Sequence, residues 1–97
     1  MSELVSKAKL ALRITTDVYY NELNDLIEAA KLDLGIAGIL LPQPLDPLVE
    51  RAIITYVKAN FGTASDGEYT RLKASYDEQK AQLQTSSGYT DWGAASG

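Results

Sequence analysis

Four carboxylates in one segment are the side chains best placed to do chemistry: Glu22, Asp25, Glu28 and Asp33. A spacing of three residues puts the first three on one face of a helix, where they could bind a divalent metal ion or transfer protons. The same spacing is typical of a solvated helix face, and Lys31 follows Glu28 at the distance of a helical ion pair. We therefore expect a solvated surface rather than an active site.

The composition removes most other catalytic and metal-binding chemistry. The 97-residue chain has no histidine and no cysteine, so it lacks the usual general base near neutral pH, the commonest metal ligand and a thiolate nucleophile. A net charge of −4 argues against a free-standing nucleic-acid binder, because such proteins neutralise phosphates with lysine and arginine. The basic cluster of Lys7, Lys9 and Arg13 is typical of a solvated face or of contact with an acidic neighbour. We expect no enzyme, no cofactor and no metal site.

Membrane insertion is also not expected. No apolar run approaches the roughly 20 residues that a membrane-spanning helix needs. The first ten residues, MSELVSKAKL, do not have the pattern of a signal peptide. We expect a protein that is made and used in the cytoplasm, or in something assembled there, with no membrane partner.

Four segments with helical periodicity must position these side chains. They cover about residues 4–12, 18–35, 47–61 and 66–85. No apolar–polar alternation is long enough to demand a sheet. The sequence therefore predicts an all-α fold, a small four-helix bundle with a long last helix and an extended C-terminal tail. We expect a helical domain over residues 1–85 and an extended arm over residues 86–97.

Capping signals mark the ends of the second helix. Thr16 or Asp17 is a natural N-cap, since a side-chain oxygen there can accept a hydrogen bond from an unpaired backbone N–H group. Gly35 is a plausible residue to end the helix in the left-handed conformation. We therefore expect the helix to begin just after Asp17 and to end at Gly35.

The third and fourth helices carry stronger signals. Asp46 followed by Pro47 has the pattern of an N-cap with proline at the first helical position, where its missing N–H group costs nothing. Gly62 is expected to end the third helix. Ser65 and Glu68 form a capping box that opens the fourth.

The predicted hydrophobic core consists of apolar residues that share a helical stripe in each segment. Because the third helix is the most apolar, we expect it to be central. The set comprises Leu12, Leu23, Leu26, Ile27, Ala30, Val49, Ala52, Ile53, Tyr56, Val57, Leu72 and Tyr76.

The connection between the second and third helices is unusually apolar for a loop. Residues 36–45 hold five large aliphatic side chains, among them Ile39, Leu40, Leu41 and Leu45. Apolar surface of this kind is normally covered. Two interpretations stay open: a lid folded onto the open end of the chain's own bundle, or a contact between subunits.

The last residues pose a similar question. Tyr89 and Trp92 lie in a Gly/Ser-rich tail that has no reason to fold alone, although tyrosine and tryptophan dominate binding hot spots. Gly88 and Gly93 bracket the pair and disfavour helix there. We expect an extended arm whose two rings enter apolar pockets of a partner, with Asp91 at the rim facing an arginine or lysine.

The order of parts now resembles a known family. A short helix ends in LALRI, and DVYYNELNDLIEAAKLDL follows. After a Gly/Pro connection come DPLVERAIITYVKANFG and EYTRLKASYDEQKAQLQTSSGYT. This sequence resembles the head–tail connector (adaptor) family of long-tailed bacteriophages, often labelled DNA-packaging proteins, over about residues 4–90.

The resemblance implies a structural protein of the virion, assembled in the bacterial host cytoplasm. Family members form a homo-oligomeric ring of about 12 copies under the portal protein. The ring extends the DNA channel and offers a docking platform for a stopper or tail-completion protein. DNA passes through it without sequence-specific binding. If about 12 subunits each carry −4, the ring carries roughly −48, which would keep DNA from adhering to the wall.

The resemblance also implies roles for named residues. The arm residues Tyr89, Asp91 and Trp92 become the portal-binding or partner-binding site. The subunit interface takes residues from the apolar loop and from the last helix, namely Ile39, Leu40, Leu41, Leu45, Tyr69 and Leu83.

One alternative belongs to a different class of protein. The chain could be a small helical adaptor or regulator that dimerises through its fourth helix and binds one protein partner. The number of subunits in the assembly distinguishes the two interpretations.

Overall fold

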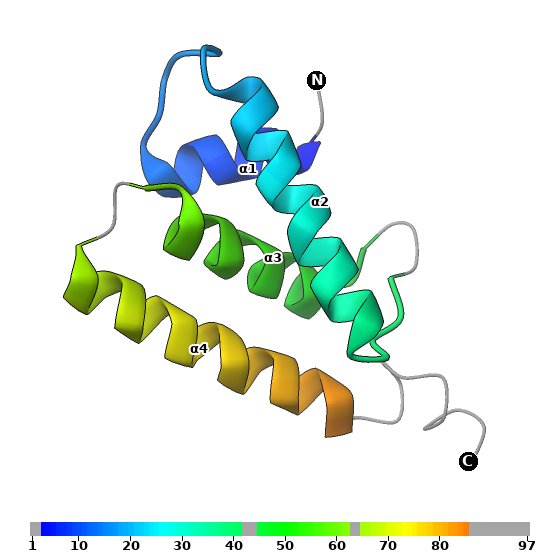
Figure 1. Ribbon diagram of the computed structural model, residues 1–97. Helices are drawn as coiled ribbons and strands as arrows, with labels where there is room; N and C mark the ends of the chain where they lie inside the picture. Colours follow the sequence, from blue (N-terminus) through cyan, green and yellow to red (C-terminus); the bar gives the residue numbers. More distant parts are fainter. Residues whose placement is uncertain (1–2, 42–44, 63–64, 86–97) are drawn as a thin grey trace.

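The computed structural model describes residues 3–41, 45–62 and 65–85. These residues form four α-helices, α1 (Glu3–Leu12), α2 (Tyr20–Ile36), α3 (Pro47–Asn60) and α4 (Asp66–Thr85). Figure 1 shows α3 in the middle, with the other three helices packed around it. The predicted all-α fold with four helices and a long last helix is confirmed. The predicted arm, residues 86–97, lies outside the described residues.

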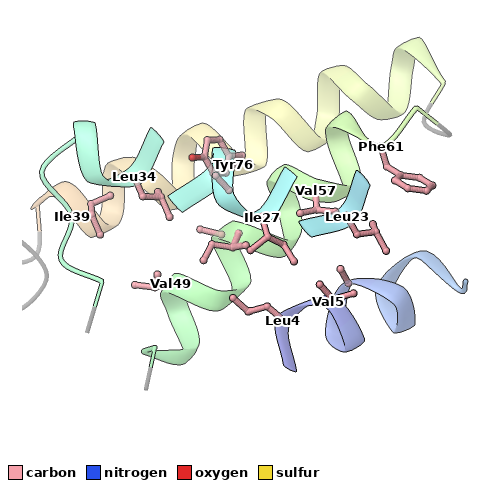
Figure 2. Packing of buried hydrophobic residues seen from close by; sticks show 14 of the residues in the cluster. Leu4, Val5, Leu23, Ile27, Leu34, Ile39, Val49, Val57, Phe61 and Tyr76 are labelled. Carbon is pink, nitrogen blue, oxygen red and sulfur yellow. The ribbon is translucent and has the colours of Figure 1, made fainter. Parts of the chain in front are cut away.

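The hydrophobic core is one cluster that gathers around α3 (Figure 2). Most of the predicted core residues are buried in it, and Ile53 has no exposed surface. Leu12, Leu26 and Tyr56 are only partly buried and pack against the cluster. Leu72 was expected in the core, but it is half-buried beside a surface groove. The cluster also contains residues outside the predicted set: Leu4, Val5, Ala8, Leu34, Ile39, Phe61 and Leu83.

The predicted start of α2 is wrong by two or three residues. The Thr16 hydroxyl accepts a hydrogen bond from the backbone N–H of Val18, at 3.2 Å, so it closes a turn before the helix. The residue at the N-cap is Tyr19, whose side chain makes no capping hydrogen bond. Instead, the Tyr19 ring packs edge-on against Phe61, with the ring centroids 5.4 Å apart. The helix start is therefore set by a ring contact with the end of α3.

The predicted end of α2 is also wrong, because the left-handed residue is Gly38 rather than Gly35. Gly38 has a φ of +88°, a conformation that glycine adopts without a steric penalty. Its N–H donates to the carbonyl of Gly35, and the N–H of Ile39 donates to the carbonyl of Leu34, both at 3.0 Å. This pair of bonds is the Schellman motif, in which the two residues joined by the bond with the larger sequence separation, here Leu34 and Ile39, usually make a hydrophobic contact. Leu34 and Ile39 are both buried, so the core selects where the helix ends.

A similar pair of bonds ends α1. The N–H of Arg13 donates to Leu10 at 3.2 Å, and the N–H of Ile14 donates to Lys9 at 2.8 Å. Arg13 has a φ of 60°, although it is not glycine. Ile14 packs against the core and keeps the motif in place.

The caps predicted for α3 and α4 are confirmed. Asp46 accepts a hydrogen bond from the N–H of Leu48 at 2.9 Å, with Pro47 at the first helical position. The Ser65 hydroxyl accepts from the N–H of Glu68 at 3.2 Å. Gly62 follows α3 with a φ of +100°.

The central position of α3 makes a testable prediction about Ile53. Replacing Ile53 with alanine removes a fully buried side chain, so we expect the free energy of unfolding to fall by about 2–4 kcal/mol in urea denaturation. Ile36→Ala is the matched control, because Ile36 is 86% exposed. The control should change the unfolding free energy by less than about 0.5 kcal/mol. Equal losses in the two variants would contradict the central role of α3.

Candidate functional site

The carboxylate row on α2 is a solvated surface. Glu22, Asp25 and Glu28 are exposed, and Glu28 pairs with Lys31 at 3.3 Å. Among the described residues, no group of three acidic side chains converges on a point where a metal ion could be held. The row therefore supplies negative charge to the surface of α2.

Asp33 does not belong to that row. It lies between α2 and α4, where it accepts a hydrogen bond from the Tyr76 hydroxyl at 2.5 Å and another from the Lys80 ammonium group at 3.1 Å. The Lys80 nitrogen also lies 5.3 Å from the centre of the Tyr76 ring, within range of a cation–π contact. Sequence analysis missed this cluster because Asp33 is more than forty residues away from its two partners.

The cluster is a structural link rather than an acid–base pair. The hydrogen bond from Tyr76, followed by the contacts with Lys80, lowers the pKa of the Asp33 carboxyl. Burial, followed by the hydrogen bond to Asp33, raises the pKa of the Tyr76 hydroxyl far above its usual range. Both pKa values move away from neutrality, so neither group can exchange a proton readily near pH 7.

A cleft of about 220 Å³ opens beside this link. It lies between α2, α3 and α4, and Tyr69 forms part of its wall with 40% of its surface exposed. Tyr56 closes the inner side, where its ring packs edge-on against Tyr76 at 5.3 Å. The predicted interface residue Tyr69 is therefore accessible to a partner.

A larger groove of about 490 Å³ lies on the other side of α4, between α1, α3 and α4. The floor carries two cations of α3, Arg51 and Lys58, and the wall includes Lys7 of α1. Lys7 is paired with Glu50 at 2.7 Å, an arrangement that raises the pKa of Lys7. The groove is thus basic, although the whole chain is acidic.

The apolar loop packs largely on its own chain. Ile39 is buried in the core, and Leu41 and Leu45 pack against it. Leu40 is 36% exposed. The lid interpretation accounts for Ile39, Leu41 and Leu45. Leu40 and Ile36, which is the last residue of α2 and 86% exposed, are the members of the predicted loop that a neighbouring molecule could contact.

The other predicted contact residues are Leu83 and the three residues of the arm. Leu83 of α4 is 3% exposed and belongs to the core, so its side chain stabilises the attachment of α4. The predicted partner-binding residues Tyr89, Asp91 and Trp92 lie outside the described residues.

The pairing of Leu32 with Ile36 in one apolar surface was not predicted. Leu32 is 68% exposed and Ile36 is 86% exposed, and they lie on the side of α2 opposite the buried Leu34. The signal was present, because Asp25, Leu32 and Ile36 follow one another at helical spacing. The pattern was hard to recognise because this part of α2 also has apolar residues on its buried side.

The basic cluster expected near the N-terminus does not form one site. Lys7 binds Glu50, whereas Lys9 binds Asp17 at 2.5 Å in the turn before α2. Both lysines contact acidic neighbours within the chain, which is one of the two arrangements expected for them. Among the described residues, no helix is both long enough and apolar enough to cross a membrane.

Comparison with known proteins identifies a family. The sequence model of the family described as "Phage connector protein" matches residues 4–90. No curated protein and no solved structure matched the chain significantly. The family match covers α2, α3 and α4, all of α1 except its first residue, and five residues after α4.

The link between Asp33 and Tyr76 makes a prediction about stability and pH. Tyr76→Phe keeps the ring but removes the hydroxyl, so the unfolding free energy at pH 7 should fall by about 1–2 kcal/mol. A fully buried hydrogen bond to a charged group would contribute more, but Asp33 is partly solvated. A lowered pKa in the folded state means that Asp33 stabilises the fold above about pH 4 and loses this effect as the pH falls further. The difference between wild type and variant should therefore shrink in acid.

Tyr69→Phe is the matched control for this measurement. The Tyr69 hydroxyl has no hydrogen-bond partner among the described residues, and the side chain is 40% exposed. Denaturant titrations of both variants between about pH 2 and pH 7 test the prediction. If the loss of unfolding free energy in Tyr76→Phe stays constant over this pH range, the hydrogen bond from Tyr76 does not lower the pKa of Asp33.

Proposed function

The chain belongs to the family of phage connector proteins, and from this premise we propose that it is a subunit of the connector between the head and the tail of a long-tailed phage. The observation that carries the proposal is the family match over residues 4–90. The protein is then a structural component of the virion, and it performs no catalysis.

In this proposal the protein forms a ring of about 12 copies beneath the portal protein. The ring extends the DNA channel and offers a platform to a stopper or tail-completion protein. DNA moves through it during packaging and ejection without sequence-specific binding. The net charge of −4 per chain supports this role, because a strongly negative ring repels the DNA backbone.

The exposed members of the predicted interface, Leu40 and Tyr69, are proposed to contact neighbouring subunits. Ile39 and Leu83 contribute from inside the chain, since they hold the loop and the end of α4 in position. The Gln84 side chain supports the same arrangement by donating a hydrogen bond to the Ala37 carbonyl at 3.2 Å. The end of α4 is therefore fixed against the end of α2.

The arm is proposed to bind the portal. It begins directly after Thr85, at the fixed end of α4. Tyr89 and Trp92 supply two large rings, and Asp91 supplies a charge for a basic residue of the portal. Ordering the dozen residues of the arm costs an amount of free energy comparable with what burying the two aromatic side chains contributes. Repetition of the contact around the oligomer therefore makes the attachment strong.

Electron microscopy of the chain mixed with the portal protein of the same phage tests the proposed role. A ring of this protein attached to one end of the portal is the expected result. A protein that remains a dimer at every concentration, with no ring beside the portal, would instead support a dimeric adaptor.

The proposed arm makes a prediction of its own. Deleting residues 86–97 should abolish attachment to the portal, because both anchoring rings are lost. The melting temperature should change little, since all four helices and the core precede the deletion. Co-sedimentation with the portal and a thermal melt followed by circular dichroism measure the two effects.

The double variant Tyr89→Ala with Trp92→Ala separates anchoring from chain length. It keeps the full arm but removes both rings, so it should bind the portal as poorly as the deletion does. If the truncated chain binds the portal as well as the full chain, the arm has no role in attachment.

A further inference from the structure

We propose that neighbouring subunits bind through two unlike faces, with the outer face of α2 on one copy seated in the groove between α1, α3 and α4 on the next. The partner is thus a second copy of this chain. The inference rests on the proposed ring and names the surfaces that join its subunits.

The outer face of α2, which we call the α2 stripe, is a surface without a partner in the described chain. It consists of Glu22, Asp25, Glu28, Leu32 and Ile36, which follow one another at helical spacing. Leu32 and Ile36 lie one turn apart and expose most of their apolar surface, so together they form an apolar patch that a partner could cover. Glu22 and Asp25 form no ion pair among the described residues. The stripe therefore offers acidic and apolar contacts together.

The groove has the complementary chemistry. Arg51 and Lys58 line its floor, and neither has an acidic partner within the described residues. Ile54 lies between them on the same face of α3, and Leu72 adds apolar surface from α4. Basic groups around an apolar centre match an acidic and apolar helix face.

One residue that lines the groove, Gln79, has an unsatisfied polar atom. The side-chain oxygen of Gln79 is buried and has no hydrogen-bond partner, while the side-chain nitrogen is 3.4 Å from the Ser75 hydroxyl. Rotating the amide by half a turn would only exchange which end is left without a partner. Buried polar atoms in folded proteins are almost always hydrogen-bonded. Because this oxygen is already inaccessible in the single chain, a neighbouring chain can donate to it only if the Gln79 side chain turns toward the groove on binding.

The two faces lie on opposite sides of the molecule. Arg51, Ile54 and Lys58 form the outward side of α3, whereas Val49 and Ile53 lie on the inward side, in the core that α3 shares with α2. The α2 stripe in turn lies opposite the buried side of α2. Figure 1 shows α2 and α4 both packed on α3, and all five residues of the stripe are exposed.

This placement decides the kind of assembly. Two unlike faces on opposite sides give a head-to-tail contact that repeats and can close into a ring. A two-fold pair that joined stripe to stripe would leave Glu22, Asp25 and Glu28 without basic partners from the other copy, because the stripe contains no lysine or arginine. The charges therefore favour the repeating contact.

Charge reversal tests the inference. One variant carries Glu22→Lys with Asp25→Lys in the α2 stripe, and the other carries Arg51→Glu with Lys58→Glu in the groove. Each variant alone should lose ring assembly, measured by native mass spectrometry and by microscopy with the portal. An equal mixture should regain rings, because each reversed face then meets a face of opposite charge. Circular dichroism checks that both variants remain helical.

The control variant is Asp77→Lys with Glu78→Lys on α4. It makes the same change in charge as the α2-stripe variant, at two exposed residues that do not line the groove. The control should assemble as the wild type does. Normal rings from both reversed variants would overturn the inference and leave the proposed function intact. Failure of their mixture to assemble would overturn it too.

Cross-linking detects the contact directly, because the natural chain has no cysteine. Asp25→Cys and Ser75→Cys chains, mixed and treated with a short bismaleimide, should give a cross-linked pair containing one chain of each kind. A mixture of Asp25→Cys and Glu78→Cys chains should give much less of the cross-linked pair. Equal yields would overturn the inference. Efficient cross-linking without rings on any portal would instead support the contact and contradict the proposed ring.

Discussion

Contact with α3 is the constraint on which the rest of the structure depends. A chain of 97 residues without cysteine has no disulfide to support a small core, so its stability rests on apolar burial. Helix α3 supplies the largest share of buried side chains, and α1, α2 and α4 each pack against it. Because α1 and α4 lie on either side of α3 and leave its outward face open, the same packing that forms the core also forms the basic groove.

The two sides of α4 have different polar environments. On the side facing α2, Asp33 is bound by both Tyr76 and Lys80, so the polar groups there are paired. On the groove side, the buried amide oxygen of Gln79 has no partner. The paired side fixes the position of α4 within the chain. Arg51 and Lys58 on the groove side have no acidic partner among the described residues, which agrees with the proposed location of the subunit contact.

Local signals in the sequence were sufficient for the four helices and for two of their caps. Asp46–Pro47 and Ser65–Glu68 act within a few residues, so they could be identified without knowledge of the fold. The end of α2 could not be placed in the same way, because Gly35 and Gly38 are equally suitable locally and the burial of Ile39 selects between them. The bond between Asp33 and Tyr76 joins residues 43 positions apart. Prediction of that bond requires the relative orientation of α2 and α4, which no local pattern contains.

Helix α4 is the longest of the four, but only Tyr76 and Leu83 of its 20 residues are buried. An element held by few buried side chains can detach at a lower free energy than the whole domain needs to unfold. Detachment of α4 would remove one wall of the groove and break the bond to Asp33. A ligand that binds the groove only when α4 is in place must then stabilise α4 by mass action. The local order of α4 and the occupancy of the groove are therefore thermodynamically linked.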